Sequence, residues 1–205
     1  MTYLILGFIT GLSLILAIGA QNILVIEQGL KKEFVFIVCL ICALSDFLLI
    51  FFGIFMFNYF QYFFTPLIEL LLNTLLLIFL LNFIWGKIHG EVHKLNLDIK
   101  EDKHSLSAVI YKTLGFTYLN PHVYSDTVFF LGNFSKDFIL YQKILFGTGA
   151  SISSFAFFFI IGYTSKFLSK YINTEKIWKI INILIIIFMS TLAFYVLVNI
   201  FNFFN

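Results

Sequence analysis

Residues 67–81 read LIELLLNTLLLIFLL, and only Glu69, Asn73 and Thr74 interrupt the apolar side chains. Polar and apolar positions do not alternate in this run, so it does not fit the strands of a membrane barrel, which alternate over about 10 residues. It fits a helix that is apolar on all sides, and about 20 such residues span the hydrocarbon of a bilayer. The stretch therefore predicts a membrane-spanning helix.

The composition of the whole chain agrees with this interpretation. Of 205 residues, 60% are apolar and only 12% are charged, and the mean hydropathy is +0.98. An average soluble domain is about 45–50% apolar and about 25% charged, and a core of ~200 residues cannot hide so much apolar surface from water. These values exclude a soluble globular enzyme, a disordered chain and a nucleic-acid binder, and they predict an integral membrane protein embedded in a lipid bilayer.

Six stretches are long and apolar enough to cross the membrane. We predict an all-α, six-helix transmembrane bundle in a single domain, 1–205, with spans at 3–26, 34–57, 65–85, 108–132, 144–163 and 177–198. The polar segment 86–107 separates a first repeat, 1–85, from a second, 108–205. Three helices in each half require the second half to be inserted upside down, and such inverted repeats recur in transporters.

The lysines predict the orientation. All 13 basic residues are lysine, and eleven of them lie in or beside the loops that follow the first, third and fifth predicted helices. They are Lys31, Lys32, Lys87, Lys94, Lys100, Lys103, Lys112, Lys166, Lys170, Lys176 and Lys179. The positive-inside rule places these odd-numbered loops in the cytoplasm. Both termini then face outward if all six segments span the membrane; five spans would change this.

Two of the predicted helices contain breaks. Gly19 loosens the backbone before Gln21 and Asn22, and Pro121 removes a hydrogen-bond donor after Asn120. Both breaks place amide side chains beside interrupted backbone. Interrupted segments at matching positions of two halves are the best sequence pointer to a transporter's binding site. The alternative for the first break is that the helix simply ends there.

Acidic residues at membrane depth are functional candidates, because a charge at a helix centre costs at least about 2.5–3.5 kcal/mol. Asp46 lies near the middle of 34–57, beside Ser45, and its structural alternative is a hydrogen bond between helices, to Ser45 or Asn22. Asp126 and His122 are four residues apart and share a face if the segment is helical; the alternative is a local capping interaction. Glu69 follows Thr65-Pro66 and reads as an ordinary helix start.

Other signals are weaker. Cys39 and Cys42 match a redox motif, but they lie in an apolar helix, where thiols are usually inert. His89, His93 and His104 surround Glu91 in the central loop, without a cysteine that would suggest a metal site. One helix carries a face of small residues that predicts close packing: Gly147, Gly149, Ala150, Ser151, Ser153 and Ser154. Enzyme signatures are absent, so we expect no catalytic residue, no cofactor and no resident metal.

Four motifs together resemble a known family. They are IGAQN at 18–22 followed by EQGL at 27–30, CALSD at 42–46, LNPHVYSDT at 119–127 and KIWKIIN at 176–182. All resemble the LysE-type basic amino acid exporters, the LysE/ArgO branch of the LysE superfamily, and the match runs nearly end to end. The related homoserine/threonine exporters usually carry Pro-Gly-Pro and Asn-Pro-Lys motifs, which this chain lacks. The departures, such as Ser125 within the third motif, leave the choice between lysine and arginine open.

The resemblance implies a secondary exporter of L-lysine, L-arginine or both in a bacterial inner membrane. The candidate substrate- and proton-binding residues are Asp46, Asp126, Gln21, Asn22, Asn120, His122 and Ser45, with helix breaks at Gly19 and Pro121. We hypothesise that the two acids bind the cationic groups of the substrate, while backbone N–H groups at the breaks bind its carboxylate. Inward H⁺ flow would drive export, with His122 as a relay.

Several alternatives stay open at this point. The cargo could be a neutral amino acid or a divalent metal held by Asp46, Asp126 and His122. A membrane thiol–disulfide carrier using Cys39 and Cys42 is a further alternative. The sequence also leaves the oligomeric state open, a homodimer included.

Overall fold

The computed structural model describes residues 1–16, 19–63, 65–90, 105–171 and 175–204, and this part of the chain is helical, without a β-strand. The expectation of an all-α fold is confirmed for these residues. The predictions on Glu91, His93, Lys94, Lys100, Lys103 and His104 concern positions outside the described residues, as does the side chain of His89.

Four long helices form most of the structure: α3 (Val35–Phe63), α4 (Pro66–Gly90), α8 (Leu140–Leu168) and α9 (Glu175–Phe204). Each contains a window long and apolar enough to cross a membrane, and each covers one of the predicted spans. Pro66 stands at the first position of α4, where a missing N–H costs nothing, and the N–H of Ile68 donates to the carbonyl of Thr65 over 2.9 Å. Thr65-Pro66 thus starts this helix, as expected.

The first predicted span is divided into two helices. α1 (Thr2–Ile15) and α2 (Ala20–Lys31) meet at an angle of 82°. Length and composition therefore support four membrane-spanning helices in the described residues, or five if α1 and α2 count as one broken span.

The predicted span 108–132 is likewise interrupted. It comprises α5 (Leu106–Tyr118), α6 (Pro121–Tyr124), the π-helical segment η1 (Ser125–Phe130) and α7 (Leu131–Phe134). The short 3₁₀ segment η2 (Ser169–Tyr171) extends α8. Because the fourth predicted span is not one long helix, six complete spans and the inverted repeat stay predictions.

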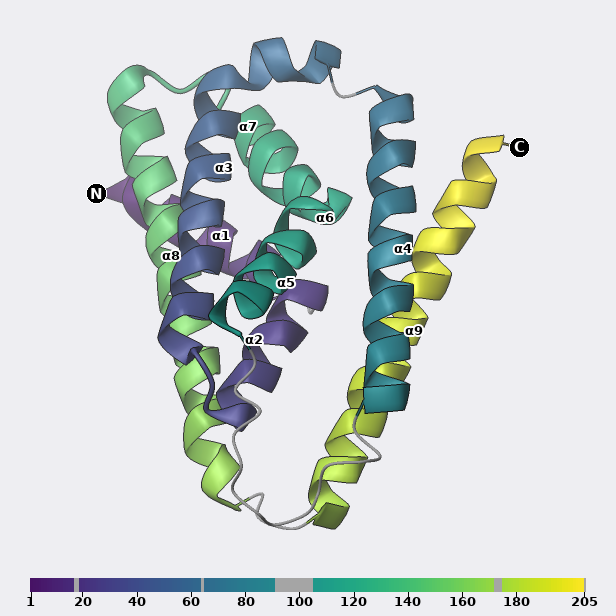
Figure 1. Ribbon diagram of the computed structural model, residues 1–205. Helices are drawn as coiled ribbons and strands as arrows, with labels where there is room; N and C mark the ends of the chain where they lie inside the picture. Colours follow the sequence, from purple (N-terminus) through teal and green to yellow (C-terminus); the bar gives the residue numbers. More distant parts are fainter. Residues whose placement is uncertain (17–18, 64, 91–104, 172–174, 205) are drawn as a thin grey trace.

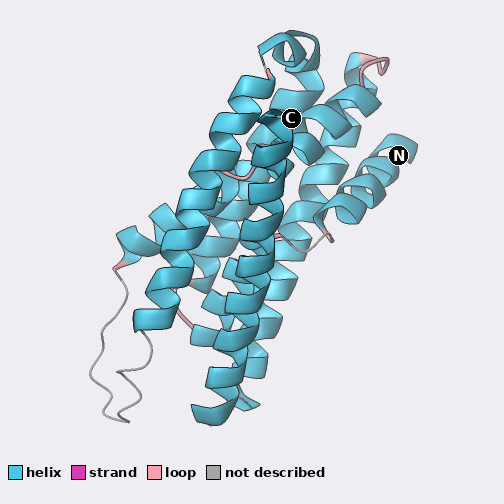
Figure 2. Cartoon of the chain, turned by 90° about the vertical axis from the view of Figure 1, so that its right-hand side faces the viewer, coloured by secondary structure: helices cyan, strands magenta, loops and turns pink. Residues whose placement is uncertain are grey.

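The two halves of the chain pack against each other helix by helix. α3 of the first half lies against α8 of the second, and α4 lies against α9 (Figures 1 and 2). α1 also packs along α8, whereas the α4–α9 pair makes few contacts with the other helices. The space beside the broken helices is therefore bordered by elements of both halves.

The packing of α1 on α8 depends on small residues. A Cβ added at Gly149 would collide with the backbone carbonyl of Leu4, and one added at Gly7 would collide with that of Phe146. The face of small residues predicted on 144–163 thus packs closely against another helix, as expected.

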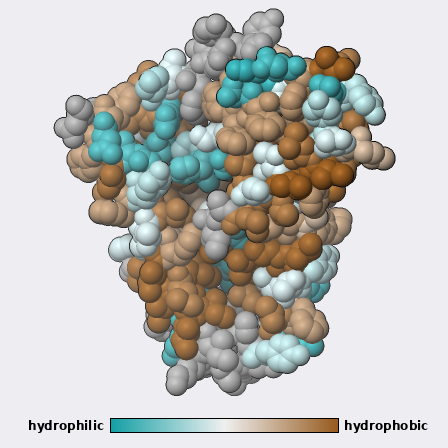
Figure 3. Space-filling model, turned by 180° about the vertical axis from the view of Figure 1, so that it is seen from behind, coloured by the Kyte–Doolittle hydropathy of each residue, from teal (hydrophilic) through white to brown (hydrophobic). Residues whose placement is uncertain are grey.

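The ends of the long helices gather at two opposite ends of the molecule. The C-terminal ends of α2, α4 and α8 lie together at the lower end of the molecule, and the end of α9, the end of α3 and the start of α4 lie at the upper end (Figure 1). Seen from behind, hydrophobic side chains dominate the middle of the surface, and hydrophilic ones gather towards the upper end (Figure 3). The described helix ends that precede the loops predicted to be cytoplasmic therefore share one end, and the orientation of that end stays a prediction.

Candidate substrate site

Both breaks direct a helix N-terminus towards the same place. Gly19 is extended (φ −114°, ψ 178°) before α2, and Asn120 is extended (φ −82°, ψ 110°) before α6. A Cβ added at Gly19 would lie 4.0 Å from Nδ2 of Asn120, so the two N-terminal caps are neighbours. The helix dipole and the N–H groups that a first helical turn leaves without an intrahelical acceptor make the start of α2 attractive to an anion. At the start of α6, Pro121 has no N–H, and the N–H groups of His122 and Val123 donate to Asn120.

Two amide side chains beside the breaks hold the interrupted backbone in place. The amide oxygen of Asn120 accepts a hydrogen bond from the N–H of His122 at 3.1 Å, a standard N-cap. Nδ2 of Asn22 donates to the carbonyl of Ile15 at 3.1 Å, which ties α2 to the end of α1 across the break. Both amides therefore support the local fold as well as lining the site.

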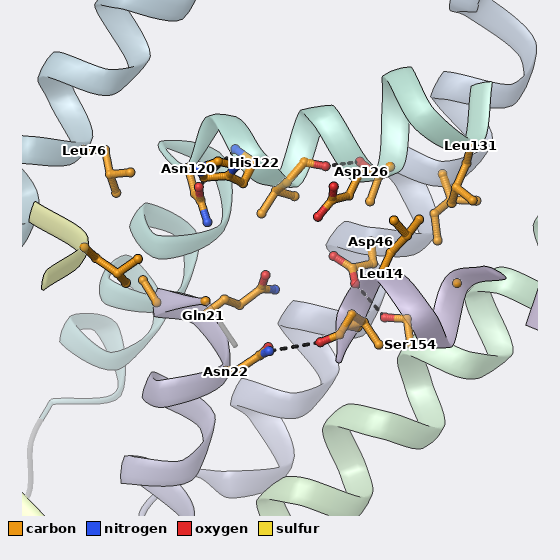
Figure 4. A pocket seen from close by; sticks show the side chains of 18 of the residues that line it. Leu14, Gln21, Asn22, Asp46, Leu76, Asn120, His122, Asp126, Leu131 and Ser154 are labelled. Atoms are coloured by element: carbon orange, nitrogen blue, oxygen red, sulfur yellow. Dashed lines mark hydrogen bonds between the residues drawn. The ribbon is translucent and has the colours of Figure 1, made fainter. Parts of the chain in front are cut away.

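Two carboxylates face each other near these helix ends (Figure 4). Asp46 on α3 is 5% exposed, and its Oδ2 accepts a hydrogen bond of 2.8 Å from the hydroxyl of Ser154 on α8. Asp126 is half-buried in η1 and is close enough for its charge to interact with that of Asp46. Each half of the chain thus supplies one acid, and the electrostatic potential between them favours a cation.

The segment that carries Asp126 is a π-helix, a form that often occurs at functional sites. His122 and Asp126 line the same cavity, although no hydrogen bond or ion pair joins these two described residues. Instead, the imidazole of His122 stacks on the ring of Tyr195 in α9, with centroids 5.6 Å apart and planes at 29°.

Gln21 adds a buried amide donor to this region. It is 6% exposed, and its Nε2 makes no hydrogen bond to any described residue. A buried donor without a partner costs about 1–3 kcal/mol. Its amide is therefore available to a ligand between the two acids and the helix ends.

These groups surround a cavity of about 440 Å³, within the range of small-molecule sites. Most of the predicted site residues line it: Gly19, Gln21, Asn22, Asp46, Asn120, His122 and Asp126. Ser45 and Pro121 do not. Ser45 is buried beside Asp46 on α3, and Pro121 starts α6. The partner of Asp46 is Ser154, rather than the Ser45 or Asn22 that the structural alternative named.

Sequence reasoning missed several lining residues. Ser154 lies in a run of small residues, which predicts packing, and nothing in the run distinguishes the one hydroxyl that faces Asp46. Tyr195 belongs to a row with Asn199 and Asn202 on α9, which sequence reasoning did not single out in this largely apolar helix. One apolar wall comes from α4 and α9, and consists of Leu76, Leu80, Leu192 and Val196. Further apolar lining residues include Leu14, Ile15, Ile50 and Leu131.

The weaker candidates gain no support from the geometry. Cys39 and Cys42 are free thiols, both buried, and Sγ of Cys39 donates to the carbonyl of Phe158 at 3.2 Å. In the part of the chain that the structure describes, no three His, Cys, Asp or Glu side chains gather as metal ligands.

Comparisons with known proteins agree with the site. The chain is 32% identical over 194 residues to arginine exporter proteins ArgO of Salmonella paratyphi A, Salmonella newport and Salmonella typhimurium, which covers 94% of this chain and 92% of each relative. No solved structure matches it significantly. The family profile of the LysE type translocators matches residues 12–200. The chain therefore belongs to the LysE family of membrane translocators.

Proposed function

We propose that this protein is a secondary transporter that exports L-arginine, with L-lysine as the second cargo, across the bacterial inner membrane in exchange for protons. The observation that carries the proposal is the cavity in which two carboxylates from two halves of the chain meet the N-terminus of α2. The similarity to arginine exporters over nearly the whole chain supports the choice of cargo.

The charges of the site complement those of a basic amino acid. Arginine and lysine each carry an α-ammonium group, a cationic side chain and one carboxylate. Asp46 and Asp126 would bind the two cationic groups, and the N–H groups at the start of α2 would bind the carboxylate. Gln21 would complete the carboxylate's hydrogen bonds. Because the chain contains no arginine, these N–H groups take the part that a guanidinium often plays in other carboxylate sites.

Export of a net cation needs a driving force, because the membrane potential opposes it by about 2.3 kcal/mol per charge per 100 mV. Proton antiport would supply that force. When the cationic substrate leaves, two facing carboxylates in a desolvated cavity would repel each other, and a proton on Asp46 would relieve this repulsion. His122, between the cavity and the upper end, would relay the proton. The loops at the lower end would then face the cytoplasm.

The test is efflux from cells that lack their own arginine and lysine exporters. Cells that express the protein and are preloaded with radiolabelled L-arginine or L-lysine should release either amino acid, and an uncoupler should abolish the release. The variant Asp46→Asn should insert normally and release neither. Asp137→Asn removes the same charge from an exposed position outside the cavity and should export normally.

Full export by Asp46→Asn would remove the coupling role of Asp46. If the inserted wild-type protein released neither amino acid, the proposed cargo would be wrong, and neutral amino acids or divalent metals would become the leading candidates. Uncoupler-insensitive release would retain the cargo and exclude proton antiport.

A further inference from the structure

A second cavity of about 360 Å³ adjoins the first, between α4, the start of α6 and the C-terminal part of α9. The two cavities share His122 and Tyr195, whose stacked rings stand between them. The second cavity is bordered by the first turns of α4 and the last turns of α9, and both lie towards the upper end of the molecule (Figure 1). On the proposed orientation this is the outer side.

The lining of this cavity is unusually polar for a groove between two apolar helices. Glu69 and Asn73 are four residues apart on α4, and Tyr195, Asn199 and Asn202 follow one another at helical spacing on α9. Residues at these spacings share a face, so the two polar rows border the same space. The position of Glu69 in the first turn of α4 explains why this residue is acidic. It does not explain Asn73 or the polar row on α9.

Asn73 points to a missing ligand. It is 5% exposed and lines the cavity, yet its Oδ1 accepts no hydrogen bond from any described residue. A buried amide oxygen of this kind is costly unless a donor reaches it. A cationic N–H group is a donor that both Asn73 and the Glu69 carboxylate would bind.

We propose that the second cavity is an outer subsite for the cationic amino acid, occupied between its release from the Asp46–Asp126 cavity and its escape to the medium. This inference rests on the proposed function and deepens it. Glu69 neutralises one cationic group and Asn73 accepts a hydrogen bond from it, while the amides of Asn199 and Asn202 replace water around the rest of the molecule. The stacked pair His122–Tyr195 separates the two subsites, and its rings must part for the substrate to pass.

The experiment measures the charge selectivity of the cavity directly, without relying on transport. In the full-length chain, Cys39→Ala and Cys42→Ala remove both native thiols, and Asn199→Cys introduces one reporter. Intact cells are then treated with a cationic and with an anionic methanethiosulfonate reagent, and the two rates of modification are compared. We expect the cationic reagent to react faster, and Glu69→Gln to lower the cation-to-anion ratio about tenfold, because one nearby charge is lost.

Two controls make the result specific. Ile139→Cys lies at the start of α8, 65% exposed and outside this cavity, so Glu69→Gln should leave its ratio unchanged. External L-arginine should slow modification of the Asn199→Cys reporter, whereas L-citrulline, its neutral analogue of the same shape, should not. Asn202→Cys serves as a second reporter in the same cavity.

Three results would overturn the subsite. One is that neither reporter reacts from the medium; another is a charge ratio that Glu69→Gln does not change; the third is equal protection by arginine and citrulline. The proposed export activity is tested separately, by the efflux assay. If the reporter is modified selectively and protected by arginine but the cells release no arginine, the cation site would stand and the proposed export function would be refuted.

Discussion

Replacing Ser154 with alanine removes the hydrogen bond that the structure gives to the carboxylate of Asp46. The two side chains are 2% and 5% exposed, and the bond measures 2.8 Å. A hydrogen bond to a charged group contributes about 1.5–3 kcal/mol, and each 1.4 kcal/mol is a factor of ten in affinity. If Ser154 orients Asp46 towards the substrate, Ser154→Ala should weaken arginine binding about 10- to 150-fold.

The assay is equilibrium binding of radiolabelled L-arginine to the purified full-length protein, together with the half-saturating concentration for export. Ser151→Ala is the matched control. Ser151 lies on the same helix and is equally buried, but its hydroxyl donates within the helix, to the carbonyl of Gly147 at 2.8 Å. The affinity of the Ser151→Ala variant for arginine should stay within about twofold of that of the wild type. Equal affinities of the two variants would refute the role assigned to Ser154.

Three further outcomes are expected. Gly149→Ala places a Cβ against the backbone of α1, so it should destabilise the protein by about 1–3 kcal/mol. Thermal unfolding in detergent measures this loss of stability. The control is Gly86→Ala, whose new Cβ has nothing within 4 Å and which should lose no stability. Asn120→Ala removes the cap of α6, worth about 1 kcal/mol, and should lower the initial rate of arginine efflux more than Asn120→Ser, which keeps a capping oxygen. Replacing Cys39 and Cys42 together with alanine should leave efflux unchanged, because both thiols are buried and neither lines the cavity; loss of efflux would return the thiol-carrier alternative.

Composition and hydrophobic run length were sufficient to predict the helices α3, α4, α8 and α9, because apolarity on all sides is a strong signal in a membrane. The breaks were also readable, since Gly19 and Pro121 change the backbone itself. The π-helix around Asp126 was not predicted. Its wider turn depends on how the segment packs against α3, and the sequence motif carries no trace of it.

The candidate site divides in the same way. Asp46 and Asp126 were identifiable because a charge in an apolar helix is costly and therefore demands an explanation. Ser154 and Tyr195 were not, because serine and tyrosine are common in packed helices and only the tertiary arrangement shows which of them face the cavity. Ser45 is the opposite case, a predicted site residue that does not line the cavity. Because it is next to Asp46 in sequence, it lies on a different side of α3.

The division of the cavity between both halves of the chain links substrate to stability. α2 and α3 contribute from the first half, and η1 and α8 from the second, so only a fully assembled protein offers the complete site. A ligand that binds the folded state alone stabilises it by about 2.7 kcal/mol at a hundred times its dissociation constant. A cell rich in the cargo would thus hold its exporter together against unfolding and proteolysis, so that abundance as well as turnover would rise with the concentration of the amino acid to be expelled.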